Sequence, residues 1–114
     1  MCIRDRHLSE DPTSGVEPLA VEFVTPSVTS QNLNEKVGDE QRTHGGDVEA
    51  AVMERNPHVR WCEFDDHGYV LLDVTRERVK AEWWHVDTVL EPSEGEALKA
   101  AWEVRAGTAR LYEG

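Results

Sequence analysis

Five histidines and an excess of carboxylates are the residues with which this 114-residue chain could do chemistry. Imidazole nitrogens and carboxylate oxygens bind metal ions and transfer protons, so together they could serve a hydrolase. The histidines are His7, His44, His58, His67 and His85. They lack the H-x-x-x-H or H-x-H spacing that places two imidazoles on one metal ion. We therefore expect each to be structural or exposed, and we rank His58 and His85 above His67 as functional candidates.

Among the carboxylates, Glu22, Asp65 and Asp66 are the ones that could bind a cation or act as acid and base. Asp65 and Asp66 stand just before Gly68. Aspartate is favoured in turns because its side chain hydrogen-bonds the local backbone. We therefore interpret Asp65 and Asp66 as turn residues.

Nucleophile and phosphate-loop motifs are missing. The hydroxyls of Ser27, Thr29 and Ser30 lie outside any G-x-S-x-G sequence. The pair Gly45-Gly46 is not followed by the Lys-Ser/Thr of a phosphate-binding loop. From the residues alone we assign no catalytic, cofactor-binding or metal-ligating position.

The chain is strongly acidic, with 23 Asp and Glu against 12 Lys and Arg and a formal net charge of -11. This charge repels nucleic-acid backbones and anionic lipid surfaces, so we expect no nucleic-acid partner and no membrane partner. No apolar run approaches the roughly 20 residues that span a bilayer, and none is of signal-peptide type. Cys2 and Cys62 are too few to indicate a disulfide framework or a zinc site.

The first half of the chain has few elements that could form a core. Residues 19–24 favour a β-strand, which Pro26 should end because proline cannot donate a ladder hydrogen bond. Residues 27–46 are polar and predict a long loop with at most a helical turn. Asp47 can cap a short helix over residues 48–55, which Asn56-Pro57 should stop.

The second half predicts an antiparallel meander. Residues 59–64 and 69–74 read as two strands of a hairpin joined by residues 65–68, and residues 79–89 as a third strand beside them. The uneven alternation of apolar residues in these strands suggests burial on both faces or a β-bulge. Residues 96–100 predict a helical turn, and residues 102–105 an edge strand that ends by Gly107. The fold class is therefore α+β and β-rich.

Four segments, in this order and spacing, resemble the C-terminal part of the PhoD-like alkaline phosphatases. They are VEFVTPSVTS at 21–30, NPH at 56–58, GYV at 68–70 and AEWWHVDT at 81–88. The resemblance extends from Leu19 to about Leu111. It implies a metallophosphoesterase with a four-layer α/β/β/α fold that is periplasmic or secreted, uses iron and calcium ions, and hydrolyses phosphate mono- and diesters.

The resemblance also implies that the metal ligands lie upstream. The family's last ligand motif, Gly-Asp-x-His, comes shortly before the strand that residues 21–23 match, where this chain has Arg4-Asp5-Arg6-His7. The spacing of Asp5 and His7 fits, but the glycine is missing, so we do not carry the ligand roles over.

We therefore expect a C-terminal fragment. Residues 1–6 look like translated adapter sequence from a metagenomic assembly, residues 7–18 like a loop or disorder, residues 19–111 like an incomplete phosphatase domain, and residues 112–114 like a tail. Such a fragment should be inactive alone, with the missing N-terminal part of the same domain as its partner. Some of its large apolar residues should be exposed where that partner belongs, the candidates being Trp61, Leu71, Leu72, Trp83 and Trp84. The alternative is an independent, small, acidic β-rich binding or interaction domain.

Overall fold

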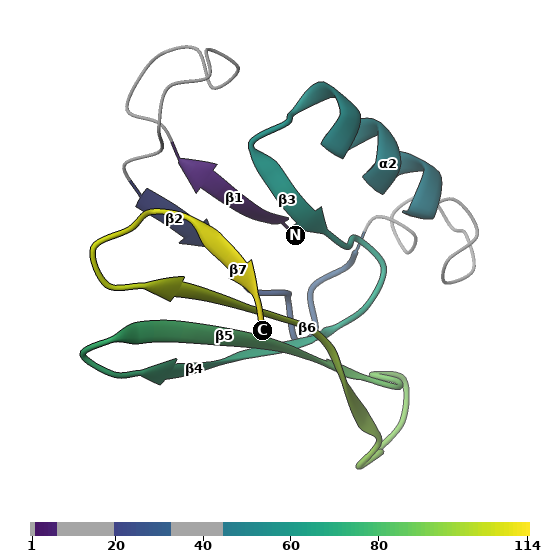
Figure 1. Ribbon diagram of the computed structural model, residues 1–114. Coiled ribbons are helices and arrows are strands. Elements are labelled where there is room, and N and C mark those ends of the chain that lie inside the picture. The colour runs from purple at the N-terminus through teal and green to yellow at the C-terminus, as the bar shows by residue number, and fades with distance from the viewer. Residues whose placement is uncertain (1, 7–19, 33–44) are drawn as a thin grey trace.

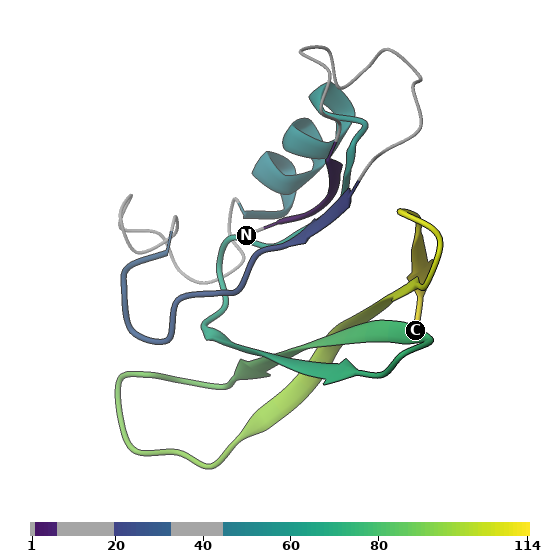
Figure 2. The same ribbon diagram turned by 90° about the vertical axis from the view of Figure 1, so that its left-hand side faces the viewer.

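The structure, a computed structural model, describes residues 2–6, 20–32 and 45–114. The described elements are β1 (Cys2–Arg6), β2 (Ala20–Phe23), α2 (Gly45–Arg55), β3 (Val59–Cys62), β4 (Gly68–Val74), β5 (Arg78–Val86), β6 (Glu96–Arg105) and β7 (Leu111–Glu113). They form two antiparallel sheets, ordered β2-β1-β3 and β4-β5-β6-β7 (Figure 1). Figure 2 shows α2 on one side of the smaller sheet and the larger sheet on the other. The β-rich class is thus confirmed, in three described layers.

The smaller sheet has the first residues of the chain at its centre. β1 pairs with β2 on one side and with β3 on the other. We expected residues 1–6, as an adapter-like segment, to take no part in the fold, and the structure differs, because two short strands pair their backbone groups with β1. The adapter origin of this segment stays a prediction. β2 ends at Phe23, shortly before Pro26, as predicted.

The helix α2 begins at Gly45 and ends at Arg55. It starts earlier than the predicted residues 48–55, and Asp47 lies in its first turn, where a negative charge complements the helix dipole. The backbone N–H of Asn56 donates a hydrogen bond to the Val52 carbonyl at 3.0 Å and completes the last turn. Pro57 prevents the helix from continuing. The helix packs against β3. The predicted loop at 27–46 and the predicted disorder at 7–18 lie largely or wholly outside the described residues.

The predicted hairpin of residues 59–64 and 69–74 is wrong. β3 pairs with β1 in the smaller sheet, whereas β4 pairs with β5 in the larger one. Residues 63–67 are therefore a crossing between sheets and not a hairpin loop. The true hairpin turn lies between β4 and β5, where the Thr75 hydroxyl accepts the Arg78 N–H at 3.1 Å. The prediction that the third strand lies beside residues 69–74 is confirmed.

The predicted helical turn at 96–100 is also wrong, whereas residues 102–105 are in a strand as predicted but not at the edge of the sheet. Residues 96–105 form one continuous strand, β6, which lies between β5 and β7. A register shift opposite Trp83 and Trp84 leaves Lys99 as an extra residue in β6, a β-bulge that we did not expect in this segment. The irregularity suggested for residues 59–64 coincides with a register shift between β1 and β3. The residues 112–114 predicted as a tail include most of β7, and Gly114 donates its N–H to Ala101 at 2.8 Å.

The core lies between the two sheets and centres on Trp83, which is 0% exposed. Its ring makes edge contacts with Phe23 at 5.6 Å and Trp61 at 5.8 Å between centroids. Its indole N–H donates to the Val24 carbonyl at 3.1 Å. The larger sheet is thereby attached to β2, β3 and the residues that follow β2.

Part of the larger sheet leaves apolar residues exposed, as expected. Leu71 and Leu72 in β4 are each 53% exposed, whereas Trp83 is buried and Trp61 and Trp84 are half-buried. Leu71 and Leu72 point to opposite faces of the strand, so β4 lacks cover on both sides. Among the described residues, no helix has the length and apolarity needed to cross a bilayer.

Candidate functional site

The crossing between the sheets, residues 63–67, is held by the carboxylate of Glu63. That carboxylate accepts the backbone N–H of Asp65 at 2.8 Å and the backbone N–H of Asp66 at 2.9 Å. Buried N–H groups without a partner would cost about 1–3 kcal/mol each, so this carboxylate stabilises the bend. The bend brings the Asp66 side chain back toward the larger sheet.

Residues that follow β2 make further contacts with the same crossing. The Ser27 carbonyl accepts the Gly68 N–H at 3.3 Å and lies 3.2 Å from His67 Nδ1. The Asn32 side chain donates to the Asp65 carbonyl at 2.9 Å. Residues just after β2 thus hold the crossing, which gives its side chains fixed positions.

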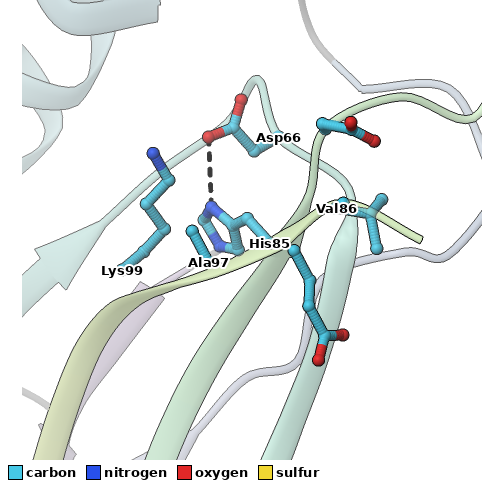
Figure 3. A pocket seen from close by; sticks show the side chains of 8 residues that line it. Asp66, His85, Val86, Ala97 and Lys99 are labelled. Carbon is cyan, nitrogen blue, oxygen red and sulfur yellow. Dashed lines mark hydrogen bonds and ion pairs between the residues drawn. The ribbon is translucent and has the colours of Figure 1, made fainter. Parts of the chain in front are cut away.

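His85 projects from β5 into this crossing. The alternation along β5 buries Ala81, Trp83 and His85 on one face, and His85 is 2% exposed. Its Nδ1 lies 3.1 Å from Asp66 Oδ2 and 3.8 Å from Glu63 Oε2 (Figure 3 shows the Asp66 bond). Its Nε2 is buried and has no hydrogen-bond partner among the described residues. The two carboxylates therefore hold the ring from one side.

Glu63, Asp66 and His85 form the one group of potential metal ligands found in the described part of the chain. One ligand atom from each lies within 4.8 Å of the others. Glu63 is 5% and Asp66 3% exposed, so the group is buried. A buried imidazole between two carboxylates can bind a cation or hold a proton at a defined atom.

A groove of about 390 Å³ reaches this group from the surface. Its lining residues are Asp66, His85, Val86, Asp87, Gly95, Glu96, Ala97 and Lys99. Lys99 is the extra residue of the β6 bulge, and Figure 3 shows its side chain extending along the same side as Asp66 and His85. Bulges of this kind redirect a side chain, here into the wall of the groove.

A sequence model of the PhoD-like phosphatase family matches residues 4–83, well over half of the chain. The chain belongs to the PhoD-like phosphatase family. The comparisons found no match among curated proteins and none among solved structures. The family match includes Glu63 and Asp66 and ends before His85.

Only some of the candidate residues predicted from the sequence lie in the site of this PhoD-like chain. The structure brings His85 and Asp66 together, and the interpretation of Asp66 as a hairpin-turn residue is wrong because its side chain bonds His85 in another strand. His67 holds the crossing against Ser27. His58 and Glu22 are not members of the group, and His7 and His44 lie outside the described residues.

Glu63 was missed as a candidate. Its sequence signal is a carboxylate placed two and three residues before the backbone N–H groups that it accepts, a local motif that stabilises bends. For His85 the signal was the period-2 pattern of β5, which places it on the same face as the buried Trp83.

Tyr69 gives a test of the groove rim. Its hydroxyl donates to Glu96 at 2.8 Å, and this hydrogen bond, with smaller contributions from desolvation and the negative charge, raises the pKa of Tyr69 above 10.0. The folded state binds that proton more tightly, so the contribution to stability is present below the unfolded pKa and is lost as the pH rises through the folded pKa. We expect Glu96→Gln to lower the pKa of Tyr69, measured by tyrosinate absorbance in a Tyr112→Phe background. An unchanged titration would show that the bond is absent in solution.

Proposed function

We propose that this chain is the C-terminal part of a PhoD-like alkaline phosphatase that hydrolyses phosphate mono- and diesters in its full-length form. The family match over residues 4–83 carries the proposal. The resemblance of residues 81–88 to the family extends the support beyond that match. By the same resemblance, we propose that the full-length protein is periplasmic or secreted.

The catalytic metals belong, in this proposal, to the upstream part of the domain. An iron and calcium site holds more than one ion and needs donors from several strands. The described residues provide a single three-ligand group, Glu63, Asp66 and His85, which suffices for at most one ion. The described residues therefore do not fit that metal site, and we route no catalytic step through them.

The exposed apolar residues of β4 support the upstream part as a partner. Exposed leucines on both sides of one strand are unusual for a protein that is complete in itself. The upstream part would cover this strand and supply the fourth layer of an α/β/β/α fold. The chain would then complete one sheet and one wall of the domain.

We expect no metal-dependent turnover of an aryl phosphate monoester or diester by the purified chain, with iron and calcium supplied. Phosphoryl transfer depends on positioned charge at the reacting phosphate, and the ligand set for that charge is not among the described residues. The measurement is the release of the aryl alcohol, with and without chelator.

The matched experiment uses the longer protein, expressed from a coding sequence recovered upstream of this one. It should hydrolyse both esters, and a chelator should abolish the activity. Chelator-sensitive turnover by the 114-residue chain itself would overturn the inactive-fragment proposal. A longer protein without esterase activity would overturn the phosphatase proposal.

An independent binding or interaction domain is the second candidate. The observation in its favour is the fully buried Trp83, which contacts both Phe23 and Trp61 across the two sheets. A closed core of this kind could support folding without a partner. Cooperative unfolding of the purified chain, with coincident transitions by two probes, would favour this candidate.

A further inference from the structure

We propose that Glu63, Asp66 and His85 form a binding site for one divalent transition-metal ion such as Zn²⁺. The site is separate from the iron and calcium site of the full-length phosphatase, and it does not depend on the phosphatase proposal. Its three donors come from the crossing between the sheets and from β5. Bound there, the ion would join the two sheets at the point where the chain passes from one to the other.

The distances fit a small ion. Zn²⁺ bonds to oxygen and nitrogen are about 2.0–2.2 Å, so neighbouring donors in a tetrahedral site lie about 3.3–3.6 Å apart. His85 Nδ1 lies 3.1 Å from Asp66 Oδ2 and 3.8 Å from Glu63 Oε2, on either side of that range. Shifts of a few tenths of an ångström would bring these two distances into that range, and all three donor atoms lie within 4.8 Å of one another. The ion would bind between Nδ1 and Asp66 Oδ2, which are in direct contact in its absence.

The contacts around the three side chains hold them ready to bind an ion without a large rearrangement. The bonds of Glu63 to the backbone of Asp65 and Asp66 fix its carboxylate before any ion arrives. His85 Nε2 has no hydrogen bond within the described residues, so nothing there locks the ring in a tautomer that would block Nδ1. Nε2 can carry the ring proton while Nδ1 binds the metal.

The donor set selects the kind of ion. A set of one imidazole and two carboxylates suits zinc and the other divalent first-row metals. Calcium takes six to eight oxygen donors at about 2.3–2.6 Å, whereas this group offers three side-chain donors, one of which is an imidazole nitrogen. We therefore expect discrimination against calcium.

The groove gives the ion a route and an open coordination position. It reaches Asp66 and His85 from the surface, and Asp87 and Glu96 add negative charge to its wall. Among the described residues, Lys99 is the only lysine or arginine that lines the groove. The three carboxylates of the lining outnumber it, and their net negative charge raises the local concentration of cations. Water from the groove would complete a four-coordinate ion.

The test is a titration of the purified, metal-free 114-residue chain with Zn²⁺ by calorimetry and with Co²⁺ by visible absorption. We expect one equivalent of each ion to bind, with a tetrahedral Co²⁺ spectrum and no comparable binding of Ca²⁺. His85→Gln should weaken Zn²⁺ binding by more than about 100-fold, because losing a direct ligand exceeds the roughly 10–100-fold effect of an outer partner. Asp66→Asn should weaken it in the same direction.

Asp73→Asn is the matched control, because it removes an exposed carboxylate of β4 and should leave binding unchanged. Circular dichroism of each variant checks that the fold is kept. Should His85→Gln not fold, Asp66→Asn alone decides the proposal, since it keeps the shape of the side chain. The absence of Zn²⁺ binding by the parent chain, equal binding by the folded ligand variants, or equal affinity for Ca²⁺ would overturn the proposal.

Discussion

Replacing Trp83 with alanine should lower the free energy of unfolding by about 3–5 kcal/mol, the range for a large aromatic residue removed from a core. Trp83 is 0% exposed and touches Phe23 and Trp61 of the smaller sheet. Its indole N–H also bonds the Val24 carbonyl at 3.1 Å. The substitution therefore removes both the packing and the hydrogen bond that connect the two sheets.

The measurement is urea unfolding followed by circular dichroism, with Trp84→Ala as the control. Trp84 is the same residue type at the next position, but it is half-buried and its N–H bonds Glu82 within the same strand. We expect Trp84→Ala to cost about 1–2 kcal/mol, because only part of its surface leaves water on folding. Equal losses for the two variants would contradict a core centred on Trp83.

Gly68→Ala should be the most damaging small substitution, with a loss of about 3 kcal/mol, at the upper end of overpacking effects. A Cβ at Gly68 would collide with the Trp84 carbonyl oxygen and lie 3.0 Å from His85 Cα. Both are backbone atoms of the paired strand β5, so no side-chain rotation relieves the contact. The strand or the crossing before it must shift, which would also draw Asp66 away from His85.

Gly114→Ala is the control that tests whether the loss of stability in Gly68→Ala comes from a steric clash of the added Cβ. A Cβ at Gly114 meets the Lys80 Cε at 3.4 Å and the backbone of Ala101 at 3.6 Å, which are ordinary contacts. This variant should unfold at the same urea concentration as the parent chain. A Gly68→Ala variant as stable as Gly114→Ala would show that β4 and β5 pair in another register.

Local sequence patterns predicted the strand and helix segments well where one rule dominated. An apolar run that follows a glycine-containing loop identified residues 69–74, alternating side chains identified the strand after them, and Asn56-Pro57 placed the end of α2. The hairpin between residues 59–64 and 69–74 failed because closeness in sequence favours a turn but does not require one. β3 pairs instead with β1, at the start of the chain.

The candidate site was predictable only in part. Its two members from the crossing lie in a segment with turn composition, and His85 is a lone histidine near the end of β5, in which apolar and charged residues are mixed. Nothing in their spacing indicates that they meet. Their meeting depends on the register in which Gly68 faces His85, and that register is set by pairing along the whole of β4 and β5.

By itself, the sequence determined the composition, the acidic charge, the β-rich class and the family, because these depend on residue types and on short segments in a fixed order. The tertiary structure alone decided which strands are neighbours and which buried groups meet. It divided the expected meander between two sheets, placed Cys2–Arg6 at the centre of one, and brought Glu63, Asp66 and His85 together. The physical reason is that strand pairing and burial depend on backbone partners and apolar surface far along the chain, which no local pattern specifies.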